Sequence, residues 1–438
     1  MENLNVSPTR APTPDRHRWK VLGIGVAANA CFSAALAGVP STAVAMRADY
    51  GLDNAALGLA LGMLGLGVAL SEVPWGMATD RLGDRRILLV GLGLSAAWLC
   101  GMALFCVPHG TTAPTLVALC VGLLLAGVFA GSVNGASGRA VMAWFAEGER
   151  GFAMSIRQTA VPLGGGLGAL VLPGLAQHHG FRVVFGALAL ASLVTAVLTW
   201  RWLHEAPGAQ GVAAASAERR GKSPLRSGVV WRLAAGIGLL CMPQVAVLSF
   251  TSVFLHDFAG LGVMAISVSL GCVQAGAMVS RVWSGRWTDR RGNRRGYMQA
   301  CCWGAALLFG ALGGLAALAQ GHGSGGVTLS LLLLTLVIAG ICVSAWHGVA
   351  FTELATLAGT QRAATALALG NTCAFAGFFI VPLLVPALQA GAGWPGVWWA
   401  CVACALMAAI AFPSARRIPV TGRCEDRAFN PHEQGERT

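Results

Sequence analysis

The chain has 438 residues, of which 55% are hydrophobic and only 11% are charged, and its formal net charge is +12 at pH 7. Soluble globular proteins have about 25% charged residues, so this composition excludes an ordinary water-soluble domain and indicates lipid as the main solvent. The basic residues stand in short clusters between apolar stretches, which argues against a nucleic-acid-binding face and favours a role in membrane orientation.

The chain begins with a polar, proline-bearing segment and continues with apolar stretches. Residues 1–20 are predicted to be a cytoplasmic tail, and no small-residue cleavage site follows the first apolar stretch, so we expect no cleaved signal peptide. A membrane-spanning helix needs about 20 apolar residues, and twelve stretches meet or approach that length. They are 21–45, 55–78, 88–107, 114–145, 152–175 and 181–203, followed by 230–255, 263–282, 298–318, 327–350, 364–388 and 397–411.

A change of composition separates the first six spans from the last six. Residues 205–229 are rich in Ala, Gly, Ser and basic residues without apolar periodicity, which predicts a cytoplasmic linker. We therefore predict an N-terminal six-helix bundle over residues 21–204, a C-terminal six-helix bundle over 230–413 and a cytoplasmic tail over 414–438.

The placement of Lys and Arg predicts the orientation. With the N-terminus in the cytoplasm, 28 of the 30 Lys and Arg residues lie in cytoplasmic segments or at cytoplasmic helix ends, and only Arg47 and Arg182 fall outside. This asymmetry follows the positive-inside rule. We expect a multi-pass protein of the bacterial cytoplasmic (inner) membrane with both termini in the cytoplasm.

An internal repeat relates the two sets of spans. A glycine, aspartate and arginine pattern follows the second span and recurs 209 residues later, after the eighth. A separate match, between residues 170–173 and 383–386, recurs at an offset of 213. Two matches favour duplication of a six-helix unit, which places a substrate site between the halves. The pattern residues are Gly76, Asp80, Arg81, Gly83, Arg85 and Arg86 in the first copy, and Gly285, Asp289, Arg290, Gly292 and Arg294 in the second.

The pattern GxxxDRxGxRR between the second and third spans resembles the signature loop of the major facilitator superfamily, and the likeness covers residues 21–411. It implies an all-α membrane protein with twelve transmembrane helices in two pseudo-symmetric six-helix bundles. It also implies a monomeric secondary transporter of a small molecule, without metal or cofactor.

The resemblance further implies a role for the pattern carboxylate, which in related members bonds to the start of the eleventh or fifth span and latches the cytoplasmic gate. Here those helices are expected to begin near Ala364 and Phe152. A helix N-terminus attracts a carboxylate, so this role suits Asp80. The alternative is a turn whose charges only set the topology.

Ionisable residues inside apolar spans cost roughly 2.5–3.5 kcal/mol each on insertion scales, so the few present are functional candidates. Glu72 and Arg281 each lie eight residues before a pattern aspartate, so the repeat places opposite charges at equivalent positions. Gate function and plain structural charge both remain open for them, and Arg281 lies near enough to the membrane surface to snorkel. The candidates for a gate or coupling role are Glu72, Arg139, Arg281 and Glu353.

A second group of residues is expected to line a central polar cavity. Arg157 lies about two turns into the fifth span, where contact with an anionic solute, gating and snorkelling all remain open. His347 is a histidine inside a span and is able to titrate. The cavity candidates are Asn134, Arg157, Gln158, Gln244, Gln274, Trp346, His347 and Asn371.

These residues favour transport over the other functions of membrane proteins. No HExxH motif, aspartate pair or serine elbow occurs in a span, so we expect no enzymatic activity. Among the embedded charges, Arg157, Arg139 and Arg281 outnumber Glu72, which favours a small organic anion as substrate. Proton coupling, sodium coupling and exchange remain open. The alternative function is proton-coupled efflux of a drug-like compound or siderophore, although Val161 departs from the glycine-proline motif of such antiporters.

Overall fold

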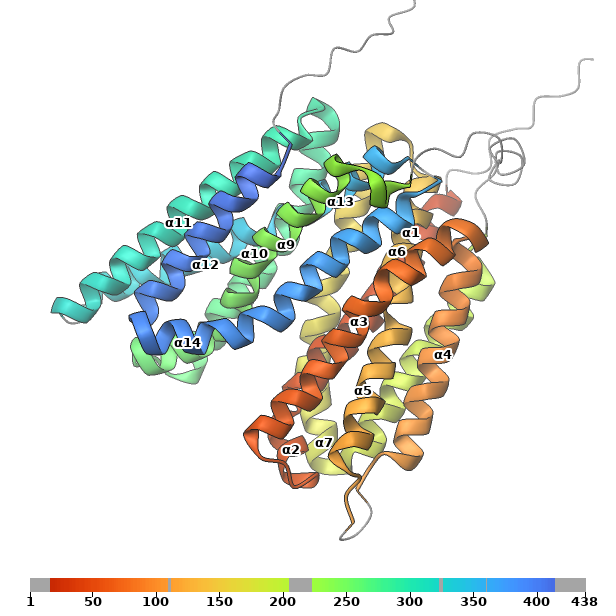
Figure 1. Cartoon of the computed structure of the whole chain (residues 1–438), viewed down its shortest axis with the longest axis horizontal. Coiled ribbons are helices and arrows are strands. Elements are labelled where there is room, and N and C mark those ends of the chain that lie inside the picture. The colour runs from red at the N-terminus through yellow and green to blue at the C-terminus, as the bar shows by residue number, and fades with distance from the viewer. Residues whose placement is uncertain (1–15, 109–111, 205–222, 323–325, 360, 414–438) are drawn as a thin grey trace, which may run out of the picture.

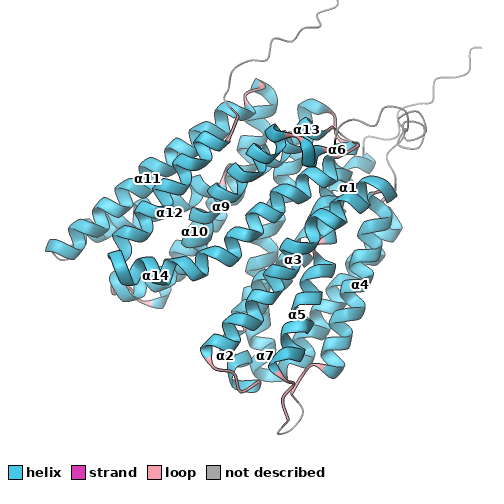
Figure 2. Cartoon of the chain, in the orientation of Figure 1, coloured by secondary structure: helices cyan, strands magenta, loops and turns pink. Residues whose placement is uncertain are grey.

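The computed structural model describes residues 16–108, 112–204, 223–322, 326–359 and 361–413. The regular elements in these ranges are helices (Figure 2). Nine helical segments of the described residues are long and apolar enough to cross a membrane. Two of them turn back at an internal kink and cross twice, and the 29-residue helix Val263–Arg291 packs among the others, so the described residues make twelve crossings, as predicted.

The helices form two groups, each around its own apolar core. The first group runs from red to yellow in Figure 1 and the second from green to blue. The first contains α1 (Arg16–Ser41), α2 (Ala43–Asp49), α3 (Asn54–Leu82), α4 (Asp84–Phe105), α5 (Leu116–Ala130), α6 (Ser132–Trp144), η1 (Glu147–Glu149) and α7 (Arg150–Trp202). The second contains η2 (Pro224–Arg226), α9 (Gly228–Val253), the π-helix η3 (Phe254–Phe258), α10 (Val263–Arg291), α11 (Arg294–His322), α12 (Gly326–Ser344), α13 (His347–Ala358) and α14 (Ala363–Ala411).

Two glycines let α7 and α14 each cross twice. Gly180 has a φ of 71° and Gly393 a φ of 64°, and both lie inside a long helix at a kink. Positive φ is unfavourable for a residue with a Cβ, so glycine is needed where the chain reverses. The two positions are 213 residues apart, the offset of the sequence repeat. The kinks are therefore equivalent in the two halves.

Several predicted boundaries are wrong in detail. Helix α1 begins at Arg16, inside the predicted tail, and the predicted spans 114–145 and 327–350 are each broken into two helices. The pattern expected in a loop is almost wholly helical, because α3 continues to Leu82 and α4 begins at Asp84. Of the predicted linker, residues 205–222 lie outside the described residues, as does the predicted tail 414–438.

The two groups meet mainly through α3 against α14 and through α7 against α10. We call the end of the bundle where α3 passes into α4, and α10 into α11, the arginine-rich end, because the pattern arginines lie there. In Figure 1 the ribbons of the two groups lie close together at this upper end and diverge towards the lower end. The polar contacts described next join the groups from this end inwards.

Candidate functional site

A carboxylate near the end of α3 binds the start of α14, across the boundary between the two groups. Asp80 accepts hydrogen bonds from the backbone N–H of Ala364 at 3.1 Å and of Thr365 at 2.9 Å, and from the Thr365 hydroxyl at 2.5 Å. The first N–H groups of a helix have no partner within the helix and carry partial positive charge, so a carboxylate is favoured there. We call this contact the first latch.

A second carboxylate makes the equivalent contact. Asp289 near the end of α10 accepts hydrogen bonds from the backbone N–H of Gly151 at 3.1 Å and of Phe152 at 2.8 Å, at the start of α7. Asp80 and Asp289 are 209 residues apart, and adding 213 to 151 and 152 gives 364 and 365. The repeat therefore relates both partners of this second latch to those of the first.

Arginines surround the two latches differently. Arg139 from α6 lies 3.5 Å from Asp80 by its Nε and also bonds Asp84, whereas Arg294 pairs with Asp289 at 3.0 Å. Glu353 pairs with Arg295 at 2.7 Å. Each of these carboxylates thus has a cationic partner near the arginine-rich end. The remaining pattern arginines lie outside the latches: Arg85 donates to the Trp200 carbonyl, and Arg81, Arg86 and Arg290 are exposed.

Two pattern glycines allow the close approach of helices beside the latches. A Cβ at Gly76 would lie 2.6 Å from the Ala368 Cβ and 2.7 Å from the Ala364 carbonyl oxygen. A Cβ at Gly285 would likewise collide with Ser155 of α7. Both distances are shorter than van der Waals contact, so a side chain at either position would separate α3 from α14 or α10 from α7. Gly83 and Gly292 only join consecutive helices.

Glu72 lies one level deeper, at the centre of a buried amide cluster. Its side chain is 0% exposed and accepts hydrogen bonds from Asn134 Nδ2 at 2.5 Å and from Asn371 Nδ2 at 3.4 Å. Asn134 belongs to the first half and Asn371 to the second, so the cluster links both. Asn134 also accepts from Arg157 through its backbone carbonyl, which places a positive charge beside this cluster. We call Glu72, Asn134, Asn371 and Arg157 the Glu72 cluster.

Arg157 is held within the first half. It is 3% exposed and donates from Nε to the Ser137 hydroxyl at 3.0 Å and from Nη2 to the Asn134 carbonyl at 2.9 Å. Its guanidinium therefore does not snorkel to the membrane surface. Asn134 bonds both Arg157 and Glu72, so the two charged residues belong to one cluster, which the sequence did not indicate because they are 85 positions apart.

Arg281 occupies the equivalent level of the second half and is also buried, with 2% exposure, so it does not snorkel either. It donates from Nε to the Ser344 carbonyl at 2.7 Å, from Nη1 to the Gln158 carbonyl at 2.8 Å and from Nη2 to His347 Nδ1 at 3.4 Å. Gln158 belongs to the first half, so this contact also crosses the boundary. We call Arg281, Gln158, Ser344 and His347 the Arg281 cluster.

The two clusters are copies of one arrangement. By the repeat offsets, Glu72 is equivalent to Arg281, Asn134 to His347 and Gln158 to Asn371. Glu72 contacts Asn134 in its own half and Asn371 in the other half. Arg281 likewise contacts His347 in its own half and Gln158 in the other half. The expected single polar cavity is instead two repeat-related clusters.

Three cavity candidates lie outside this arrangement. Trp346 is fully buried, donates to the Val343 carbonyl and stacks on His347 with 3.9 Å between ring centroids. Gln244 is buried and accepts from the Cys241 thiol, and Gln274 is half-buried on α10. Trp346 is therefore a packing residue of the core rather than a cavity-lining one.

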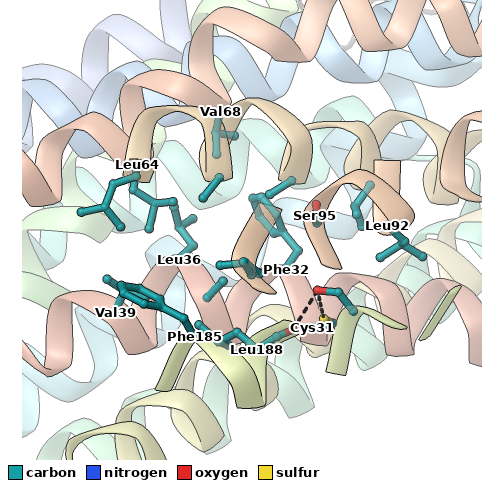
Figure 3. A pocket seen from close by; sticks show the side chains of 17 residues that line it. Cys31, Phe32, Leu36, Val39, Leu64, Val68, Leu92, Ser95, Phe185 and Leu188 are labelled. Carbon is teal, nitrogen blue, oxygen red and sulfur yellow. Dashed lines mark hydrogen bonds between the residues drawn. The ribbon is translucent and has the colours of Figure 1, made fainter. Parts of the chain in front are cut away.

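An apolar cavity of about 30 Å³ lies inside the first half (Figure 3). Its walls include Phe32, Leu64 and Phe185, and its few polar groups include Ser95 and the Cys31 thiol, which faces Ser192 at 3.6 Å. None of the predicted site residues lines it. A space of this size holds about one water molecule, so it is a packing defect rather than a substrate site.

Sequence reasoning missed several residues that complete these sites. Thr365 adds a hydroxyl to the first latch, Ser137 accepts from Arg157, and Arg295 neutralises Glu353. Thr365 had a signal in the sequence, since it stands at the helix start that the repeat pairs with Phe152, and so did Arg295, which is the repeat equivalent of Arg86. Ser137 is an ordinary polar residue whose partner comes from another helix.

Comparisons with known proteins agree with this architecture. A family model described as "Major Facilitator Superfamily" matches residues 24–312. An uncharacterized MFS-type transporter of Mycobacterium tuberculosis is 30% identical over 400 residues, covering 90% of this chain and 84% of the relative. A probable anion transporter of Arabidopsis thaliana is 31% identical over 178 residues, 40% of each chain. The solved proton:xylose symporter XylE shares the fold, with a TM-score of 0.74 at 15% identity over 92% of this chain and 98% of the symporter.

Proposed function

The chain belongs to the major facilitator superfamily, and from that premise we propose that it carries a small organic anion across the bacterial cytoplasmic membrane by alternating access. Its class is that of a secondary transporter and not of an enzyme. In this proposal the arginine-rich end is cytoplasmic. Solute moves either by symport with a proton or sodium ion or by exchange.

The observation that carries the proposal is the pair of latches. Each joins a carboxylate of one half to the helix start of the other half, and both lie at one end of the bundle. For that end to open, both sets of hydrogen bonds have to break together. Breaking and remaking them is the movement that alternating access requires, so we assign Asp80, Asp289, Arg139 and Arg294 to the cytoplasmic gate.

Two observations support an anion as the substrate. The buried ionisable side chains of the described helices are Glu72, Glu353, Arg157 and Arg281, and Glu353 is already paired with Arg295, so the other three are two arginines and one carboxyl group. The Arabidopsis relative bears the name of a probable anion transporter. For the coupling ion, Glu72 is the candidate carrier, since Glu353 is already paired with Arg295.

Counterflow in vesicles tests the proposal. Purified protein in proteoliposomes is loaded with one unlabelled compound and supplied with the radiolabelled form, using carboxylates and phosphate esters against neutral sugars and cationic dyes. We expect saturable counterflow of at least one anion. Non-saturable flux would indicate a channel, and counterflow confined to cations or neutral compounds would reject the anionic substrate.

Reporter fusions test the orientation separately. An indicator that is active only in the cytoplasm should be active after Arg86, within residues 205–227 or after Arg417, and inactive after His109 or Gly321. An inactive fusion within residues 205–227 would contradict both the orientation and the six-plus-six division of the chain.

A further inference from the structure

Arg281 is a buried cation whose hydrogen-bonding partners are all neutral. Its three contacts are two backbone carbonyls and one imidazole nitrogen, and among the described residues no carboxylate lies within ion-pair distance. A guanidinium has five N–H groups, so two remain for another acceptor. Burying a charge without a counter-charge is unfavourable, and buried charges in proteins are normally paired.

The equivalent position in the first half shows what a satisfied cluster contains. Glu72 has two amide donors and the nearby positive charge of Arg157. Adding 213 to 157 gives 370, and that position holds glycine, so the second half has no charged residue where the first half has Arg157. The two clusters thus share their geometry, but only the Glu72 cluster contains side chains of both charge types, joined through Asn134.

The surroundings of Arg281 suit a ligand. It lies at the break between α12 and α13, where the chain leaves the helix at Ala345 and Trp346. The Ser344 carbonyl at this break accepts from Arg281, and discontinuous helices commonly form the binding sites of transporters. His347 is half-buried rather than sealed, and Gln158 comes from the other half. A ligand on Arg281 therefore contacts both halves.

We infer that the negatively charged group of the transported compound supplies the missing counter-charge of Arg281, with Gln158 and His347 beside it. The inference rests on the proposed transport of an anion and names its anchor. The site accepts one carboxylate or phosphate-ester group, since it offers one unpaired positive charge. Arg157, held by Ser137 and the Asn134 carbonyl beside Glu72, is a positioning residue in this arrangement.

Charge-selective labelling tests the site without knowledge of the substrate. The variant His347→Cys is treated with anionic 2-sulfonatoethyl methanethiosulfonate and, separately, with the cationic trimethylammonium analogue. Mass spectrometry measures the labelling rate of residue 347 with each reagent. We expect the anionic-to-cationic rate ratio to fall at least tenfold when Arg281→Gln is added, because an unpaired charge at this range dominates the local ion concentration. Arg281→Lys should keep most of the preference.

Arg232→Gln is the matched control, because it removes the same charge from an exposed arginine whose contact is the Ile410 carbonyl. The ratio should stay unchanged there. A ratio insensitive to Arg281→Gln, or a cysteine at 347 that neither reagent reaches, would overturn the inference. Counterflow distinguishes failure of this inference from failure of the proposed function. If Arg281→Gln keeps anion counterflow with an unchanged half-saturation concentration, anion transport stands and Arg281 is not the anchor. If labelling is charge-selective but no anion shows counterflow, the site stands and the transported compound is not an anion.

Discussion

The two latches and the two buried clusters are each related by the same repeat, yet only the latches are alike in chemistry. Asp80 and Asp289 both accept from two backbone N–H groups at a helix start. Deeper in the bundle, the equivalent positions hold Glu72 in one half and Arg281 in the other. Backbone donors are present whatever the side chains are, so a latch survives divergence of the copies. The charge of each buried cluster is set by the side chain at position 72 or 281, so the clusters are free to specialise.

The charge difference between the clusters predicts the largest effect. Arg157→Gln leaves Glu72 buried without its positive neighbour and should lower the free energy of unfolding by about 3 kcal/mol. Arg281→Gln removes a charge that has no carboxylate partner and should cost clearly less. Tryptophan fluorescence during thermal unfolding in detergent measures both.

The double variant Glu72→Gln with Arg157→Gln is the control, since it removes both charges and should recover most of the lost stability. If the double variant is as unstable as the sum of the single variants, Glu72 and Arg157 do not interact, and the comparison between the clusters fails.

The close approach of α3 and α14 gives the next largest effect. Gly76→Ala places a Cβ against Ala368 and the Ala364 carbonyl, and the overpacking should cost roughly 1–3 kcal/mol in the latched state. Transport should fall roughly tenfold or more. Gly65→Ala on the same helix meets no atom within 4 Å and should leave vesicle transport at the wild-type level. Equal rates in the two variants would show that the packing beside the latch is not limiting.

Neutralising a latch should have a comparable but smaller effect. Asp80→Asn keeps the shape but loses the charge that binds the start of α14, which weakens charge-assisted hydrogen bonds worth about 1.5–3 kcal/mol. Transport should fall roughly tenfold while the protein still inserts, and a cysteine at Ala364 should be labelled faster from the arginine-rich side.

Two further variants calibrate this result. Asp289→Asn should give a similar loss, because the second latch uses the same kind of donors. Asp53→Asn is the control, since Asp53 is exposed and caps α3 at its other end. Unchanged transport and labelling in Asp80→Asn would make the aspartate a helix-end residue without a gating role.

The smallest effect concerns the hydroxyl donor of the first latch. Thr365→Val keeps the shape of the side chain and removes the hydroxyl hydrogen bond to Asp80, which is worth about 1 kcal/mol. Transport in vesicles should fall roughly threefold to fivefold. Thr372→Val is the control on the same helix, since its hydroxyl donates to the Ala69 carbonyl rather than to a latch. A larger loss in the control than in Thr365→Val would remove the hydroxyl from the gate.

Short segments of the sequence determine some features of this protein, and the packing of distant helices determines others. The helix count, the repeat and the helix starts near Ala364 and Phe152 were predictable, because apolar length and the spacing of aspartate, glycine and arginine are properties of short segments. The breaks at Gly131 and at Ala345 were not, since an apolar run reads the same whether the helix continues or bends. Only the tertiary structure joined Arg157 and Glu72 through Asn134 and left Arg281 without a carboxylate within ion-pair distance. A buried charge depends on which distant helix packs against it, and no local pattern encodes that neighbour.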